Sequence, residues 1–201
     1  MDDVQIELVD TPPVVPEYVP TGLMGTVRNA DVVCVVVEAG DAAVEQVDLV
    51  LGVLSARGLT LRSAPRTELP PADGSQRPGL IVASKADLAA RETIEALRDL
   101  YAGGAHGVTR PTVGLEVVAV SARTRQGLAE LFQRLWGLLG MIRVYSKEPG
   151  KPPDLHKPFI VPAGATVAEL AGQIHRDLPG RMKFARLWGH SRFEGQQVHK
   201  S

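Results

Sequence analysis

The feature that most constrains the fold is a series of apolar runs rich in Val and Ile, separated by segments with helical periodicity. The runs are VQIELV (4–9), DVVCVVVEA (31–39), GLIVAS (79–84) and LEVVAVSA (115–122). The second and third are apolar almost throughout, which is typical of strands covered on both faces. Helical patterns occur at 41–57, 88–101 and 126–139. This alternation predicts an α/β domain with a mostly parallel sheet and flanking helices.

Residues 141–201 differ from residues 1–140 in charge and in pattern. Residues 1–140 hold 12 Lys and Arg against 18 Asp and Glu, whereas residues 141–201 hold 10 against 5 and four of the five His. After the short strand pattern IRVYS come a Pro-rich loop, a second strand pattern (PFIVPAG), a helix and a third strand pattern (KFARLWG). Thr166 and Glu169 have the spacing of a capping box that opens this helix, which is expected to run to about residue 178. We therefore expect two domains, 1–140 and a small α+β unit at 141–201.

The single cysteine and the N-terminal residues exclude several classes of protein. Cys34 has no second cysteine to pair with, so neither a disulfide framework nor a CxxC metal site is available, and we expect it to be a buried core thiol. No apolar run approaches the roughly 18 residues of a membrane span. The acidic start MDDVQ lacks a signal-peptide pattern. These features predict a cytoplasmic protein without a membrane partner.

Short polar motifs follow three of the predicted strands. In chain order they are Asp10-Thr11-Pro12-Pro13, Ser84-Lys85-Ala86-Asp87 and Ser121-Ala122-Arg123. Ligands of open α/β sheets bind beyond the carboxyl ends of the strands, so these motifs are placed to share one crevice. Each motif alone is weak evidence, because Ser84 or Asp87 has an equally good structural role as the cap of a helix. Their order and strand context together favour a nucleotide site.

The chemistry of these residues points to guanine. A carboxylate such as Asp87 accepts hydrogen bonds from N1–H and N2–H of guanine, a pattern that adenine lacks. The aliphatic stem of Lys85 can lie along the purine face, and backbone N–H groups around Ala122 can donate to O6. Asp10 is placed to hold Mg²⁺ through water at the phosphates, and Thr11 offers a backbone amide.

The chain resembles the Obg-type GTPases, in particular the developmentally regulated GTP-binding protein (DRG) branch. The resemblance rests on DTPP followed by Glu17-Tyr18 and GTVRNAD (25–31), and on RVYSKEPGKPPD, PFIV and FARLWG in the C-terminal part. The C-terminal stretches are similar to the TGS domain, a small β-grasp, ubiquitin-like module. The resemblance implies a partial P-loop G domain at 1–140 and a TGS domain at 141–201. It also implies GTP or GDP and Mg²⁺ as ligands, and the ribosome, rRNA or tRNA as a partner of the TGS domain.

Several positions depart from the family pattern. No GxxxxGK[ST] phosphate loop occurs in the sequence, Pro13 replaces the glycine of DxxG, and Ser84 replaces the usual Asn. Proline has no N–H to offer a γ-phosphate. We therefore expect weak GTP binding, no measurable hydrolysis and no catalytic residue in this chain. The expectation is a fragment of a GTPase, incomplete at both ends, and the alternative is a non-enzymatic module on a degenerate G-domain scaffold.

The basic unit at 141–201 favours a polyanionic partner, although a merely solvated basic face explains its charge equally well. We single out Lys183 and Arg186 as the residues that contact RNA or a partner. Trp188 and Phe184 have the chemistry to stack on bases, but we expect them to be core residues of a small domain. The sequence indicates no DNA partner, and it does not fix the oligomeric state.

Overall fold

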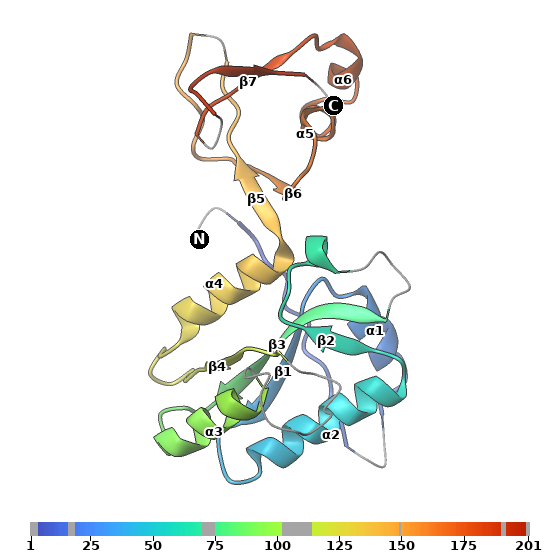
Figure 1. Ribbon diagram of the computed structural model, residues 1–201, viewed down its shortest axis with the longest axis vertical. Coiled ribbons are helices and arrows are strands. Elements are labelled where there is room, and N and C mark those ends of the chain that lie inside the picture. Colours follow the sequence, from blue (N-terminus) through green and yellow to red (C-terminus); the bar gives the residue numbers. More distant parts are fainter. Residues whose placement is uncertain are drawn as a thin grey trace. The chain divides into compact units, whose positions relative to one another are not determined.

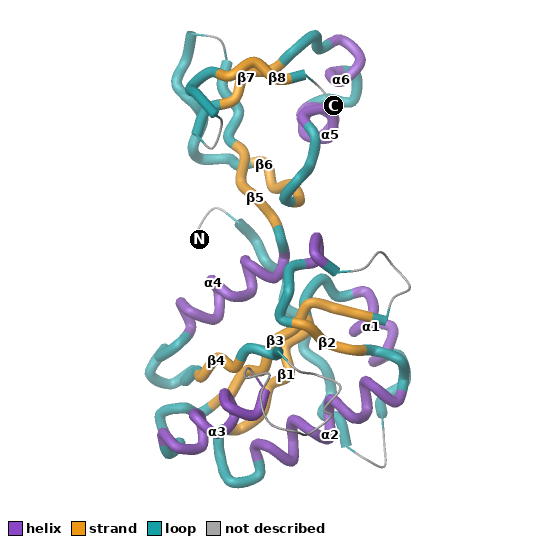
Figure 2. The backbone as a smooth tube through the Cα atoms, in the orientation of Figure 1, coloured by secondary structure: helices purple, strands orange, loops and turns teal. Residues whose placement is uncertain are grey.

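We describe a computed structural model of the 201-residue chain, shown as a ribbon in Figure 1 and as a tube in Figure 2. The structure describes residues 4–15, 19–69, 75–101, 114–148, 150–189 and 192–199. Glu17-Tyr18 and residues 70–74 lie outside these ranges. The chain divides into two compact units, Leu8–Gly140 and Met141–Ser201 together with Met1–Glu7.

The first unit is built on a four-stranded sheet in which one long strand pairs with the other three. Its strands are β1 (Val33–Glu38), β2 (Thr60–Arg62), β3 (Gln76–Ser84) and β4 (Val117–Ala119). All three pairs with β3 are parallel, with β1 along one edge and β2 and β4 along successive parts of the other. The mostly parallel α/β sheet is therefore confirmed.

Helices cover the two faces of this sheet. The first unit has α1 (Leu23–Asn29), α2 (Ala43–Ala56), η1 (Arg66–Glu68), α3 (Arg91–Tyr101) and α4 (Leu128–Leu139). Ile81 and Ala83 of β3 pack in one core cluster with residues of α1, α2 and α3, whereas Leu80 and Val82 pack in another with α4. Alternate side chains of a strand point to opposite faces, so β3 is buried on both.

The predicted strand at 4–9 is wrong. Residues 4–10 have no regular secondary structure, and the side chains of Leu8 and Val9 are 73% and 63% exposed. An apolar run becomes a strand only when a neighbouring strand accepts its backbone hydrogen bonds. Within the described part of the chain, β1 pairs with β3 alone, so no strand is hydrogen-bonded to this run.

The predicted burial of β1 on both faces, and of Cys34 within the core, is also wrong. Val35 and Val37 are buried, but Cys34 and Val36 alternate with them and are exposed. The reason is that α4 packs over residues of β3 and β4 on this side of the sheet and does not extend across β1. Although Cys34 reaches the surface, partial burial still raises the pKa of its thiol to about 11.

Among its described residues, the second unit has two antiparallel strand pairs and two helices. The strands are β5 (Met141–Val144) with β6 (Phe159–Pro162), and β7 (Ala185–Leu187) with β8 (Gln196–Val198). The helices are α5 (Val167–Ile174) and α6 (Leu178–Arg181), so the single helix predicted to residue 178 is interrupted. No helix in the described ranges has the length and hydropathy needed to cross a membrane.

The start of α5 confirms the predicted capping box. The hydroxyl of Thr166 accepts from the backbone N–H of Glu169 at 3.2 Å, and the Glu169 carboxylate accepts from the backbone N–H of Thr166 at 2.6 Å. The bond from the backbone N–H of Thr166, followed by one from the Thr166 hydroxyl to Glu169 Oε2 at 3.0 Å, lowers the pKa of Glu169. Two N–H groups that the first helical turn leaves unpaired are satisfied in this way.

Candidate functional site

Two of the predicted motifs follow neighbouring strands and are joined by backbone hydrogen bonds. Ala83 at the end of β3 is paired with Ala119 at the end of β4, and both strands run in the same direction. Beyond this pair, the N–H of Val120 donates to Ala83 O at 2.8 Å, and the N–H of Ala86 donates to Val120 O at 3.0 Å. The sheet register therefore holds the Ser84–Asp87 and Ser121–Arg123 loops side by side.

The Asp87 side chain is fixed in this region by hydrogen bonds from the neighbouring loop. Arg123 donates to its Oδ2 through Nε at 2.8 Å and through Nη2 at 2.6 Å. The buried hydroxyl of Ser121 also hydrogen-bonds the Asp87 side chain, and this bond, followed by that of Arg123, lowers the pKa of Asp87. Only 9% of the Asp87 side chain is exposed, against 72% for Arg123. The carboxylate is therefore ionised at neutral pH and covered by an exposed arginine.

Lys85 and Ser84 connect the same loop to β1. The ammonium of Lys85 lies 2.5 Å from Oε2 of Glu38, the last residue of β1, and both side chains are more than half exposed. Lys85 also has a left-handed backbone, with φ of 55°. The hydroxyl of Ser84 donates to Val37 O at 2.8 Å. Ser84 thus links β3 to β1. This hydrogen bond was not expected from the asparagine that usually occupies the position in the family.

Glu38 was missed in the sequence analysis, although a signal for it exists. It is paired with Ser84 in the β1–β3 register, so it occupies the same sheet edge as the Ser84–Asp87 loop. A carboxylate at the end of the neighbouring parallel strand is a natural partner for a lysine just beyond β3. The site is therefore formed by the ends of three strands.

The loop that contains Ala122 is a tight turn closed by its own hydrogen bonds. Ser121 N–H donates to Gln126 O at 3.0 Å, and Thr124 N–H donates to the Ser121 hydroxyl at 3.1 Å. Ala122 is exposed in this turn. Gly127 then starts α4 with φ of 72°, and a Cβ added there would lie 2.0 Å from Ala119 O. The close approach of α4 to β4 requires glycine at this position.

Asp10 and Thr11 are not brought to this group. Both are exposed in the segment without regular structure, and no hydrogen bond or ion pair within the described residues joins them to either loop. The described part of the chain also contains no cluster of three or more His, Cys, Asp or Glu suited to a metal. One carboxylate fits Mg²⁺ only when phosphate oxygens and water complete the shell. The roles of Asp10 in Mg²⁺ binding and of Thr11 in phosphate binding stay predictions.

The second unit presents its basic and aromatic residues on the surface. Lys183 and Arg186 are exposed, as their predicted role requires. Trp188 and Phe184 are 49% and 46% exposed, so the expectation that they are core residues is wrong. The ammonium of Lys147 lies 4.8 Å from the centre of the Trp188 ring. This distance is typical of a cation–π contact.

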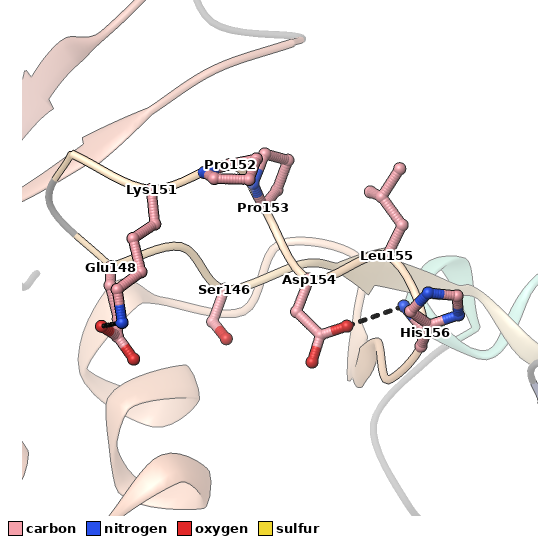
Figure 3. A pocket seen from close by; sticks show the side chains of 8 residues that line it. All are labelled: Ser146, Glu148, Lys151, Pro152, Pro153, Asp154, Leu155 and His156. Atoms are coloured by element: carbon pink, nitrogen blue, oxygen red, sulfur yellow. Dashed lines mark hydrogen bonds and ion pairs between the residues drawn. The ribbon is translucent and has the colours of Figure 1, made fainter.

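A shallow hollow lies along residues 146–156 of the same unit (Figure 3). Lys151 and Glu148 form an ion pair at its rim at 2.5 Å, and Asp154 Oδ1 accepts from the backbone N–H of His156 at 2.9 Å. These polar groups interact with one another, and the loop that carries them is exposed. The polar groups of the hollow are therefore paired within their own loop, and the hollow is not a second candidate ligand site.

Comparisons with known proteins find similarity to a domain family and to GTP-binding proteins. Residues 142–201 match the model of the TGS domain. A GTP-binding protein of Halobacterium salinarum is 32% identical over 166 residues, which are 75% of this chain and 42% of the relative. The developmentally regulated G-protein 2 of Arabidopsis thaliana is 38% identical over 77 residues, 37% of this chain and 19% of the relative.

The chain is a relative of the DRG-type GTP-binding proteins and carries a TGS domain. A GTP-binding protein of Methanocaldococcus jannaschii, 30% identical over 122 residues, matches 60% of this chain and 29% of its own length. The chain thus spans less than half the length of these relatives. The TGS match confirms a β-grasp module at the C-terminal end of this DRG relative.

Proposed function

We propose that residues 8–140 recognise the guanine base of GTP or GDP, with Asp87 as the residue that reads the base. The observation that carries this proposal is the ionised carboxylate of Asp87, held between two loops by Ser121 and Arg123. The Asp87 carboxylate can accept hydrogen bonds from N1–H and N2–H of guanine. A base that lacks these two donors would leave the carboxylate unpaired, and the site therefore rejects it. Lys85 supports the base, and the turn at Ala122 supplies N–H donors for O6.

Affinity for the whole nucleotide is expected to be low. Most of the binding energy for GTP comes from a cradle of backbone amides, a lysine and Mg²⁺ at the phosphates. The sequence has no GxxxxGK[ST], and Pro13 cannot donate a hydrogen bond to a γ-phosphate. Asp10 and Thr11 are the residues available for Mg²⁺ and phosphate. Base recognition without hydrolysis is the activity that we assign to this chain.

Calorimetric titration of the full chain with GDP, GTP and ATP in the presence of Mg²⁺ tests this function. We expect weak binding of the guanine nucleotides, none of ATP, and no phosphate release from GTP. Asp87→Asn should move the preference from guanine to xanthine, because the 2-oxo group of xanthine needs a donor. Arg91→Ala, which removes an exposed arginine elsewhere, is the matched control. Micromolar affinity, turnover of GTP or unchanged base preference in Asp87→Asn would contradict the assignment.

A second candidate function is supported by the surface of the second unit. We propose that residues 141–201 bind RNA or the ribosome weakly and without sequence preference, in the cytoplasm. The support is the excess of 10 Lys and Arg over 5 Asp and Glu, together with the half-exposed rings of Trp188 and Phe184. Phosphate contacts supply charge-dependent affinity, and exposed rings can stack on bases. If both this and base recognition fail, the alternative of a non-enzymatic protein-interaction module becomes the better account.

Co-sedimentation of the full chain with ribosomes across a salt series tests the second function. Binding should fall steeply with salt, and Lys183→Glu with Arg186→Glu should weaken it. Arg91→Glu with Arg134→Glu makes the same change in net charge in the other unit and should leave binding intact. No co-sedimentation at low salt, or equal loss in both double variants, would contradict a role for Lys183 and Arg186.

A further inference from the structure

The residue that covers Asp87 is, like the proposed ligand, a donor of two hydrogen bonds. Arg123 directs two N–H groups, Nε–H and Nη2–H, at the Asp87 carboxylate, at 2.8 and 2.6 Å. Guanine also presents two N–H groups to a carboxylate, through N1 and N2, whereas both N–H groups of Arg123 end on one oxygen, Oδ2. A guanidinium is planar and matches carboxylates as a fork, which a lysine ammonium cannot do. Arg123 therefore occupies Oδ2, one of the two acceptor oxygens that the base requires.

The two partners of Asp87 differ in how they can be displaced. Ser121 is fully buried, and its hydroxyl also accepts from the backbone N–H of Thr124, so its position is fixed by the loop. Arg123 is 72% exposed and approaches Asp87 from the solvent side, leaving only 9% of the Asp87 side chain accessible. When Arg123 leaves, its own guanidinium returns to water, and only the nearly buried Asp87 carboxylate needs a replacement donor. The base must replace Arg123 and keep Ser121.

We propose that Arg123 is an intramolecular competitor of guanine at Asp87, a residue that lowers the affinity of the site for the base. This inference rests on the proposed base recognition by Asp87. A competitor lowers apparent affinity by the fraction of molecules in which the site is closed. A ligand that does not hydrogen-bond Asp87 has no need to displace Arg123, so the arginine lowers the affinity of guanine in particular.

The test is a titration of the full chain with guanosine and adenosine, followed by NMR, in the parent protein and in Arg123→Ala. Guanosine carries no phosphate, so the measurement isolates base recognition. We expect Arg123→Ala to bind guanosine about two- to fivefold more tightly, the factor that corresponds to an exposed ion pair. Adenosine binding should not improve to the same extent. Arg91→Ala, which breaks an exposed ion pair with Glu95, should bind guanosine like the parent.

A second measurement follows the Asp87 carboxyl itself by ¹³C NMR as pH is varied, without any ligand. Removal of Arg123 should raise the pKa of Asp87, and Arg123→Lys should give an intermediate value because it keeps the charge and loses the fork. An unchanged pKa in Arg123→Ala would overturn the inference, since it would mean that the pair does not form.

The outcomes separate this inference from the proposed function. Guanosine binding of equal or lower affinity in Arg123→Ala, with a raised pKa of Asp87, overturns competition and leaves base recognition intact. Absence of guanosine binding in both proteins at millimolar concentration overturns base recognition and the inference together. Tighter guanosine binding that survives in Arg123→Ala with Asp87→Asn would also overturn it, because the gain would not depend on the carboxylate.

Discussion

Residues 8–140 bury large side chains on both faces of a sheet, whereas residues 141–201 bury only Val161 and Ala171 among the described hydrophobic residues. Several large apolar side chains of the second unit are exposed instead, namely Ile142, Leu155, Ile174, Phe184, Leu187, Trp188 and Phe193. Small domains bury a smaller share of their surface than larger ones. The first unit therefore depends on layered packing, and the second depends more on local hydrogen bonds such as the capping box.

The chain contains a tryptophan in each unit, which makes this comparison measurable. Trp136 lies in α4 and Trp188 follows β7, and the sequence has no third tryptophan. Replacing either one by Phe gives a protein whose fluorescence reports one unit. We expect the transition reported by Trp136 to occur at higher urea concentration than that reported by Trp188. Coincident transitions would contradict the difference in stability between the units.

The largest effect should come from truncating the core of the first unit. Leu97 is fully buried in the cluster beneath α3, so Leu97→Ala removes packed atoms and leaves a cavity. We expect the free energy of unfolding reported by Trp136 to fall by about 2–5 kcal/mol. Leu155→Ala, at a side chain that is 61% exposed in the second unit, should have almost no effect on either transition. Similar losses in both variants would remove the contrast between the units.

A smaller but sharper effect is expected at the start of α4. Gly127→Ala would place Cβ 2.0 Å from Ala119 O at a φ of 72°, and this backbone contact cannot be relieved by a side-chain rotation. We expect a loss of at least about 2 kcal/mol in urea unfolding. Gly137→Ala in the same helix meets open space and should stabilise by about 0.5–1 kcal/mol. Equal changes in the free energy of unfolding for the two variants would show that Gly127 does not lie as close to Ala119 O as described.

The stability of the second unit should depend more than that of the first on a single helix cap. Thr166→Ala removes a side chain that accepts from Glu169 N–H at the start of α5. We expect a loss of about 1 kcal/mol in the transition reported by Trp188 and none in that reported by Trp136. Thr166→Ser keeps the hydroxyl and serves as the control. A loss confined to the Trp136 signal, or no loss, would be incompatible with a cap-dependent second unit.

The smallest effect is a dependence of the second unit on acid pH. Folding lowers the pKa of Glu169 because its carboxylate accepts from Thr166. A carboxyl with a lowered pKa stabilises the folded state above its ordinary pKa, and this contribution disappears as pH falls through the folded value. Stability reported by Trp188 should therefore decline below about pH 4.3. Thr166→Ala removes the hydroxyl bond and keeps the larger backbone one, so it should flatten part of the decline. Parallel acid curves for the parent and the variant would argue against it.

The sequence predicted the strongly patterned elements of the first unit, including the short β4, and missed β2 in this unit and β8 in the second. The helices at 43–56 and 128–139 and the strand at 33–38 have clear periodicity or sustained hydrophobicity, whereas the strand predicted at 79–84 begins earlier, at Gln76. β2 was missed because it adjoins a Pro-rich segment that indicates a loop, and β8 was missed because QQV is polar. The run at 4–9 has the pattern of a strand, but pairing depends on a neighbour that the pattern does not specify.

The candidate site was predictable at the level of loops but not of side chains. Motifs at the ends of successive parallel strands placed the Asp87 and Ser121 loops together. The ion pair between Asp87 and Arg123 was not predicted. It depends on side-chain rotamers and on the relative positions of the two loops, which the sequence pattern does not specify. The half-exposed Trp188 was misjudged because aromatic residues are usually buried, and a unit with few buried partners does not follow this rule.

The pairing of β3 with all three other strands has a consequence for how the first unit folds. Each of these parallel pairs joins segments that are far apart in the chain, so none can form as a local hairpin. Loop closure must precede every pair, and such topologies fold slowly and in a concerted way. Because both loops of the candidate site extend from β3 and its neighbour β4, the arrangement of Asp87 and Ser121 can form only when this non-local pair of strands has formed. Local structure in the helices alone cannot bring the two loops together.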